Sequence, residues 1–246
     1  MNGLPLKNIL SKSWQLIKAH KLLTVIILLL FYGIIEYFRL PDREEIRGLK
    51  KQTPKTTALM EARREAAVDD GKKYFLRQQT IPLGQMSIHL KHAVIAAEDG
   101  AFYQHEGIDW YEVKESLKKD IKKGRFARGA STITQQLAKN IYLSTSKNPV
   151  RKIKEVFIAW MIEDELSKSR ILELYLNLIE WGNGIFGIEA ASQVYFGKHA
   201  SDLSREEAAS LAAVIPSPLK HKPNIENRYL KYRRKIILAR MAARGW

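Results

Sequence analysis

Ala93-Val94-Ile95-Ala96-Ala97-Glu98-Asp99-Gly100 carries an apolar run directly into two carboxylates and a glycine. From Ser87 onward the apolar residues recur at near-helical spacing, which predicts a helix over 87–97 that stops at Asp99-Gly100. Adjacent residues do not share a helix face, so only one of Glu98 and Asp99 can point into a given cleft while the other braces the backbone. The apolar neighbourhood would raise the pKa of that carboxyl toward the range useful for a general base.

Further helical runs extend on both sides of this junction. They cover 57–67, 111–123, 132–142, 150–166, 168–178, 188–196 and 205–214. Thr132 with Gln135 three positions on fits a capping box at the start of one of them. Long alternating β-branched runs are missing, so any sheet must be small. The sequence therefore predicts a mainly α fold, with one globular unit over 74–246.

The N-terminal part of the chain predicts a membrane anchor. An uncharged run begins at Leu22, and a helix over 22–38 would be about 25 Å long at about 1.5 Å per residue, near the short limit for crossing a bilayer. Lysines without any acidic residue precede it, so we expect residues 1–21 in the cytoplasm and the chain after residue 40 outside. A cleaved signal peptide and a buried core helix are the alternatives, but no small-residue cleavage site follows the run.

Residues 39–73 mix charges of both signs with Pro41 and Pro54 and lack a sustained apolar period. We expect a stalk or linker there, with one helix.

The net charge of +15 and the pI near 9.8 require an anionic partner. Nucleic acid, acidic lipid headgroups and phosphorylated substrates meet that requirement equally well, although the predicted orientation argues against nucleic acid. Cysteine is absent, which excludes a disulfide framework and a thiolate metal site.

Gly129-Ala130-Ser131-Thr132 forms the predicted start of the helix over 132–142. Free backbone N–H groups and two hydroxyls at a helix start suit an anion such as pyrophosphate, although an ordinary capped surface helix has the same pattern. On the helix that follows, Gln135 and Gln136 flank the ammonium of Lys139.

Arg151-Lys152-Ile153-Lys154-Glu155 places three cations within little more than one helical turn. Arg151 and Glu155 are spaced for an ordinary helix salt bridge, but the three cations together form a site for concentrated negative charge. Glu155 would organise that site directly or through a bound divalent cation. A second basic stretch, Lys118 to Arg128, is typical of a solvated face and would attract anionic lipid near a membrane.

From about Pro82 to Arg240 the chain resembles the monofunctional members of glycosyltransferase family 51, the biosynthetic peptidoglycan transglycosylases. The residues that carry the resemblance are Glu98-Asp99-x-x-Phe102-x-x-His105-x-Gly107, Gly129-Ala130-Ser131-Thr132-Ile133-Thr134-Gln135-Gln136, Arg151-Lys152-x-Lys154-Glu155, Leu166-Ser167-Lys168-x-x-Ile171-Leu172-Glu173-x-Tyr175-Leu176-Asn177, and Gly182-x-Gly184-x-x-Gly187 through Ala190-Ala191 to Tyr195-Phe196-Gly197-Lys198. The chain ends soon after Arg240, so we expect no transpeptidase domain.

This resemblance implies an enzyme that polymerises lipid II into β-1,4-linked glycan strands with inversion, releasing undecaprenyl pyrophosphate. It implies a lysozyme-like helical lobe and a smaller, membrane-associated jaw lobe. Glu98 would be the general base and Glu155 a second catalytic residue, which would hold the cations or a magnesium ion. The substrate-binding residues would be Asp99, Phe102, His105, Ser131, Thr132, Gln135, Gln136, Lys139, Arg151, Lys152 and Lys154.

The implied partners are lipid II, the growing lipid-linked chain, membrane lipids and cell-wall synthesis or division proteins. We expect a single-pass protein of the cytoplasmic (inner) membrane with its catalytic domain on the outer side, a divalent cation such as Mg²⁺, and neither an organic cofactor nor nucleic acid. The chain departs from the family pattern at Lys147, where many relatives have arginine. Lysine can neutralise a phosphate but cannot make the bidentate fork of a guanidinium.

Two other function classes compete with the polymerase. A glycan-cleaving enzyme such as a lytic transglycosylase would also use one glutamate but would not need the cations. A non-catalytic anchored protein could bind anionic cell-wall polymer through its basic face.

Overall fold

The computed structural model describes residues 20–123, 131–143, 145 and 148–246, and its fold is mainly α-helical, as predicted. The chain divides into two units, Met1–Pro41 and Asp42–Trp246. The first contains helix α2 (Lys21–Phe38), which agrees with the predicted anchor over 22–38. None of its residues is buried, and its length and composition suffice to cross a membrane.

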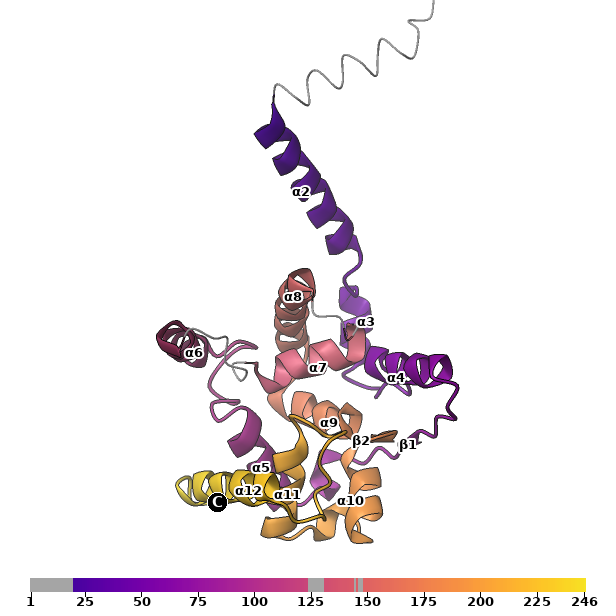
Figure 1. The fold of residues 1–246 in the computed structure, drawn as a ribbon, viewed down its shortest axis with the longest axis vertical. Coiled ribbons are helices and arrows are strands. Elements are labelled where there is room, and N and C mark those ends of the chain that lie inside the picture. The colour runs from indigo at the N-terminus through magenta and orange to yellow at the C-terminus, as the bar shows by residue number, and fades with distance from the viewer. Residues whose placement is uncertain (1–19, 124–130, 144, 146–147) are drawn as a thin grey trace, which may run out of the picture. The chain divides into compact units, whose positions relative to one another are not determined.

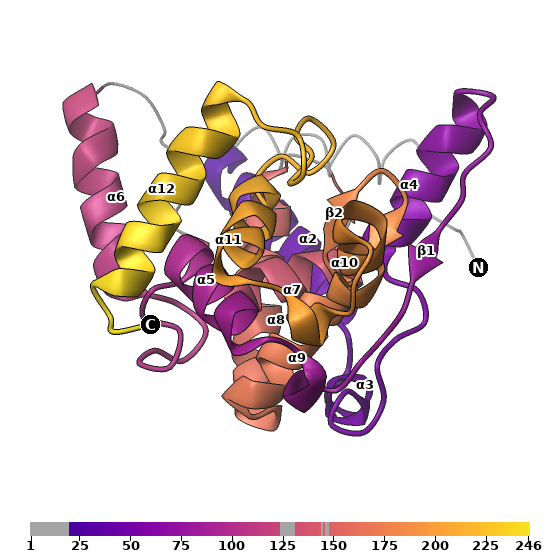
Figure 2. The ribbon, with the colours of Figure 1, turned by 90° about the horizontal axis from the view of Figure 1, so that it is seen from below.

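Helix α5 (Ile88–Glu98) is the central support of the site in the second unit. It packs against α11 (Arg205–Val214), which in turn packs against α12 (Arg228–Ala242), and α12 also contacts α5 (Figure 2). The contact faces of α5 and α11 are rich in fully buried alanines, which let the two backbones approach closely: Ala93, Ala208, Ala209, Ala212 and Ala213. The end of α5 is therefore held by close packing on two helices.

A second group of helices surrounds α7 (Ile133–Tyr142), which packs against α8 (Pro149–Glu165) and α9 (Lys168–Leu178) (Figure 1). Leu137, Ile158 and Tyr175 are completely buried between them. Helices α6 (Trp110–Lys123) and α10 (Ile188–Phe196) and the short 3₁₀ turns η1 (Leu83–Gln85) and η2 (Ala200–Asp202) complete the helical part. The predicted helices over 57–67, 87–97, 111–123, 132–142, 150–166, 168–178, 188–196 and 205–214 all agree with helices of the structure within a few residues.

The sheet is small, as expected from the absence of alternating runs. Strand β3 (Ile185–Phe186) lies between β1 (Arg77–Gln78), to which it is parallel, and β2 (Glu180–Gly182), to which it is antiparallel. Gly187 leaves the sheet with φ of +79°, and a Cβ there would lie 2.7 Å from the carbonyl oxygen of Asn177. Only glycine fits this close approach between the sheet and α9.

The prediction of a stalk over 39–73 is wrong for most of its length. Residues from Asp42 onward belong to the compact unit, where α3 (Arg43–Gly48) packs on α8 and α4 (Ala58–Asp69) packs on α7. Ile46 and Met60 are almost completely buried. The globular unit therefore begins near residue 42 rather than 74, because two short helices bury single apolar residues too sparsely spaced to give a periodic signal.

The division into a lysozyme-like lobe and a jaw lobe stays a prediction of the resemblance. The described part of the second unit clusters as one compact body.

Candidate active site

Glu98 is the last residue of α5, and its side chain is 11% exposed. Its Oε2 accepts a hydrogen bond of 2.9 Å from Nε2 of Gln136, whose Oε1 accepts one of 3.0 Å from the hydroxyl of Tyr175. Nη2 of Arg233, from α12, lies 3.7 Å from Oε1. Three helices in addition to α5 therefore fix this carboxylate.

Burial raises the pKa of Glu98 above its ordinary value of 4.5. The hydrogen bond from Gln136 and the charges of Arg233 and Lys139 oppose that rise, and the neighbouring Asp99 adds to it. A carboxylate with a raised pKa that still has one edge open is suited to take a proton.

Asp99 braces the backbone, which is the second role expected of the Glu98–Asp99 pair. Its side chain is 2% exposed, and its Oδ2 accepts a 3.0 Å hydrogen bond from the backbone N–H of Ile133, in the first turn of α7. Nε2 of His105 lies 2.9 Å from its Oδ1. Asp99 thus joins the end of α5 to the start of α7, and Glu98 alone of the two has an open edge.

Four of the predicted substrate-binding residues are held inside the protein. Phe102 is completely buried, and the His105 ring is tied to Asp99. Thr132 donates a 2.6 Å hydrogen bond to the carbonyl of Gly107 and forms the predicted capping box with Gln135, which confirms that prediction. These contacts to protein partners shape the loops around Glu98, and the substrate contacts expected of these residues stay a prediction.

The cations of α8 gather around Glu155, which is buried. Nη1 of Arg151 lies 2.9 Å from its Oε2, Nζ of Lys152 contacts its Oε1, and the same Nζ donates a 2.8 Å hydrogen bond to Oγ of Ser131. Lys154 is half-buried on the same helix. This arrangement brings Ser131 and the Arg151 block together, as the motifs required.

Lys139 is influenced by the charges of both this cluster and Glu98. Burial lowers its pKa, while the carboxylates of Glu155 and Glu98 act to raise it, and the cations of Arg151 and Lys152 act to lower it. The pKa of Lys139 therefore depends on the charges of both the proposed base and the cation cluster.

The surroundings of Glu155 do not fit a metal ligand. Both of its carboxylate oxygens contact cationic side chains. Over the ranges that the structure describes, there is also no cluster of three or more His, Asp or Glu side chains able to hold a metal ion. We derive no step through a protein-held metal at this residue.

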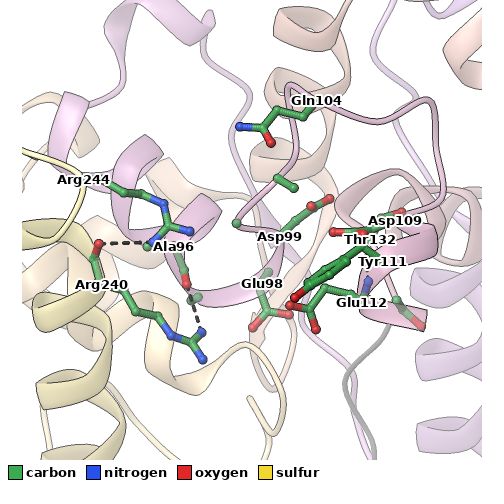
Figure 3. A pocket seen from close by; sticks show the side chains of 14 residues that line it. Ala96, Glu98, Asp99, Gln104, Asp109, Tyr111, Glu112, Thr132, Arg240 and Arg244 are labelled. Carbon is green, nitrogen blue, oxygen red and sulfur yellow. Dashed lines mark hydrogen bonds between the residues drawn. The ribbon is translucent and has the colours of Figure 1, made fainter. Parts of the chain in front are cut away.

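Two clefts flank the Glu98–Gln136 pair. The first, of about 510 Å³, is lined by residues of α5, of the loop after it, of the segment that leads into α7, and of the chain around the start of α6 and the end of α12: Ala96, Ala97, Glu98, Asp99, Gly100, Ala101, Gln104, Asp109, Tyr111, Glu112, Ser131, Thr132, Arg240 and Arg244 (Figure 3). The second, of about 520 Å³, is lined among others by Gln136, Lys139, Arg151 and Arg63. The proposed base thus faces one cleft, and the cations face the next.

Sequence reasoning missed three contributors to this site. Tyr175 lay within a quoted motif but received no role, and its pKa is raised well above 10 by complete burial, so it donates to Gln136 as a neutral phenol. Arg233 and Arg240 lie in a strongly basic helix, where nothing in the sequence distinguishes a cation that faces Glu98 from a solvated one.

Three basic residues singled out in the sequence, Lys147, Arg125 and Arg128, lie outside the described residues.

Comparisons with known proteins agree with this geometry. A family model described as Transglycosylase matches residues 68–242. Proteins named biosynthetic peptidoglycan transglycosylase are similar to this chain over most of their length. One from Nitrosospira multiformis is 45% identical over 88% of this chain and 94% of the relative, and one from Methylobacillus flagellatus is 47% identical over 78% and 83%. One from Dechloromonas aromatica is 49% identical over 68% and 73%. On the matched domain, on these identities and on the buried glutamate beside a cation cluster, the chain belongs to the transglycosylase family.

Proposed function

We propose that this chain is a peptidoglycan glycosyltransferase that polymerises lipid II into β-1,4-linked glycan strands. The single observation that carries the proposal is the pairing of one buried carboxylate with a separate cluster of cations. Glu98 supplies the base, and Lys139 and Arg151 supply positive charge in the neighbouring cleft. Lys152 lies beside Arg151, because both contact Glu155. A glycan-cleaving enzyme would have use for the first feature only.

Glu98 would remove the proton from the 4-hydroxyl of the acceptor sugar. The oxygen attacks the anomeric carbon of the growing chain from the face opposite its pyrophosphate, which gives the β bond by inversion. The C–O bond to the pyrophosphate breaks in the same step, and its electron pair leaves with the phosphate oxygens. Gln136 keeps the carboxylate pointed into the first cleft through its 2.9 Å hydrogen bond.

The leaving pyrophosphate needs charge stabilisation rather than a proton. Arg151 and Lys152 are fixed before the reaction because Glu155 holds both of them. Positive charge that is already oriented in a partly buried cleft stabilises developing negative charge without reorganisation. Ser131, which accepts a hydrogen bond from Lys152 and lines the Glu98 cleft, places a hydroxyl between the base and the cations of α8.

The substrate carries a lipid, so the enzyme must work at a membrane. We propose that α2 is an uncleaved anchor in the cytoplasmic (inner) membrane, with the N-terminus inside and the catalytic unit on the outer side. A reporter fused after residue 246 should be active only outside the cytoplasm. Activity of that reporter only inside would overturn the orientation.

The decisive test of the activity is the incubation of purified full-length protein with labelled lipid II. We expect a high-molecular-weight product that lysozyme digests to disaccharide units. If no polymer forms under conditions in which a known polymerase is active, the proposal is wrong.

A further inference from the structure

Two arginines of the α12 end of the chain line the Glu98 cleft and have no carboxylate partner among the described residues. Nη1 of Arg240 donates a 3.1 Å hydrogen bond to the carbonyl of Ala96, and Nη1 of Arg244 donates one of 3.2 Å to the carbonyl of Arg240. Both contacts are to backbone oxygens, so the two positive charges are not neutralised. Figure 3 shows both guanidinium groups on the same side of Glu98.

Arg244 contacts a residue that follows it, Trp246. The ring of Trp246 stacks on His92 of α5, with centroids 4.3 Å apart, and the guanidinium of Arg244 lies 5.7 Å from the centre of the same Trp246 ring. A Cβ at Gly100 would lie 2.5 Å from Nη2 of Arg244, so the guanidinium lies directly against the loop after Glu98. The arginine is thus directed toward the turn that follows Glu98.

The charge of the cleft is divided between its walls. Arg240 and Arg244 stand on the α12 side, while Asp109 and Glu112, at the start of α6, line the cleft on the other side of Glu98 (Figure 3). A ligand that fills this cleft would therefore place a negative group against α12 and keep it away from α6. A guanidinium fork matches a carboxylate or a phosphate oxygen pair.

The remaining surface of the unit decides between those two anions. Exposed Ile153, Phe157 and Trp160 form an apolar stripe along α8, the helix that also carries the Arg151 cluster. Figure 1 shows α8 at the upper end of the compact unit and α12 at its lower end. The phosphates of a lipid-linked substrate stay next to the lipid, so they belong with the apolar stripe rather than with α12. The anion that reaches α12 must come from another part of the substrate.

We propose that Arg240 and Arg244 bind a carboxylate of the peptide branch of lipid II held in the Glu98 cleft. The inference rests on the proposed polymerase function and adds to it a site that recognises the peptide branch of the substrate. The two guanidinium groups orient the sugar that carries the peptide, while Glu98 acts on the hydroxyl of the acceptor.

The test compares two forms of lipid II, one with free peptide carboxylates and one with those carboxylates amidated. Full-length wild type and Arg244→Ala are each measured on both substrates, as kcat/KM for polymer formation. Loss of a charge-assisted contact should lower kcat/KM of Arg244→Ala about 10-fold on the free carboxylate substrate. For wild type, kcat/KM on the amidated substrate should be lower than on the free carboxylate substrate by a similar factor. On the amidated substrate, Arg244→Ala should be no slower than wild type. Arg244→Lys should recover part of kcat/KM on the free carboxylate substrate.

Arg228→Ala is the matched control, because Arg228 is an exposed arginine at the other end of α12 and lines a different cavity. It should leave both rates unchanged. Equal loss on both substrates in Arg244→Ala would overturn the inference in favour of phosphate binding or a structural role, and so would no loss on either. A wild-type protein that polymerises neither substrate would instead refute the proposed function, and this inference with it.

Discussion

At the scale of single residues, the central feature is a carboxylate whose protonation is set by opposing influences. Burial raises the pKa of Glu98, and Gln136 and Arg233 act against that rise. Because the base must be ionised to accept a proton, kcat/KM should fall as the pH drops through this raised pKa. The acidic limb of the pH profile should therefore lie above 4.5, the ordinary carboxyl value.

Arg233→Met tests that balance. Removal of a positive charge 3.7 Å from Oε1 raises the pKa of Glu98 further, so the acidic limb of kcat/KM should move to higher pH. Arg234→Met is the control, since the neighbouring Arg234 pairs with Glu226 at 3.0 Å instead, and its limb should not move. A limb that stays in place in Arg233→Met would show that this arginine does not act on the base.

The residues around Glu98 also show what sequence could predict. The distinction between Glu98 and Asp99 followed from helix geometry, because neighbours on a helix face different directions. The contact of Arg233 could not be predicted, because it joins residues 98 and 233, and one cation among the many of α12 carries no distinguishing pattern. Substrate binding by Thr132 and Gln135 stays a prediction, because a capped helix start and an anion site share the same residue types and the structure shows the cap.

At the scale of elements, the start of α7 matters because it meets the end of α5. Thr132 caps α7 and also holds the carbonyl of Gly107, while Asp99 holds the N–H of Ile133. Long periodic helices were predicted within a few residues because each buries a whole apolar face. Helices α3 and α12 were missed, the first because it is short and the second because its buried residues are few among basic ones: Leu230, Ile237 and Met241.

A pair of capping substitutions separates stability from activity. Thr132→Ala removes the cap of α7 and the bond to Gly107, so we expect a loss of about 1–2 kcal/mol in the free energy of unfolding, together with reduced polymerisation. Ser204 is an exposed residue that caps α11 in a second capping box. Ser204→Ala should lower the free energy of unfolding by about 1 kcal/mol with little loss of activity.

Denaturant unfolding and initial rates on lipid II measure the two effects. Equal losses of activity in both variants would mean that the start of α7 has no special role in the site.

At the scale of the whole molecule, the described part of the chain contains an apolar helix and a compact unit with its own core. None of the residues of α2 is buried, whereas the unit from Asp42 onward contains α3, α4 and every residue of the site. The anchor could be predicted from composition alone, because a bilayer requires a long uncharged run. The beginning of the compact unit could not, because contacts such as Arg63 with Glu180 join parts of the chain far apart in sequence.

Removal of residues 1–41 tests this division. The chain over 42–246 should keep the unfolding temperature of the full chain in the same detergent, because none of the residues of α2 is buried and the compact unit has its own core. It should also bind vesicles more weakly than the full chain, as flotation would measure. A marked fall in the unfolding temperature would show that α2 contributes to the core.

The most direct test of the account is the rate of lipid II polymerisation by Glu98→Gln. Glutamine keeps the shape but cannot accept the proton, so we predict a rate at least about 100-fold below that of wild type. The raised pKa means that ionised Glu98 costs stability above that pKa, a cost that disappears as the pH falls below 4.5. The variant should therefore unfold at neutral pH at the same temperature as wild type or a higher one. A stable Glu98→Gln protein that polymerises lipid II at the wild-type rate would contradict the account.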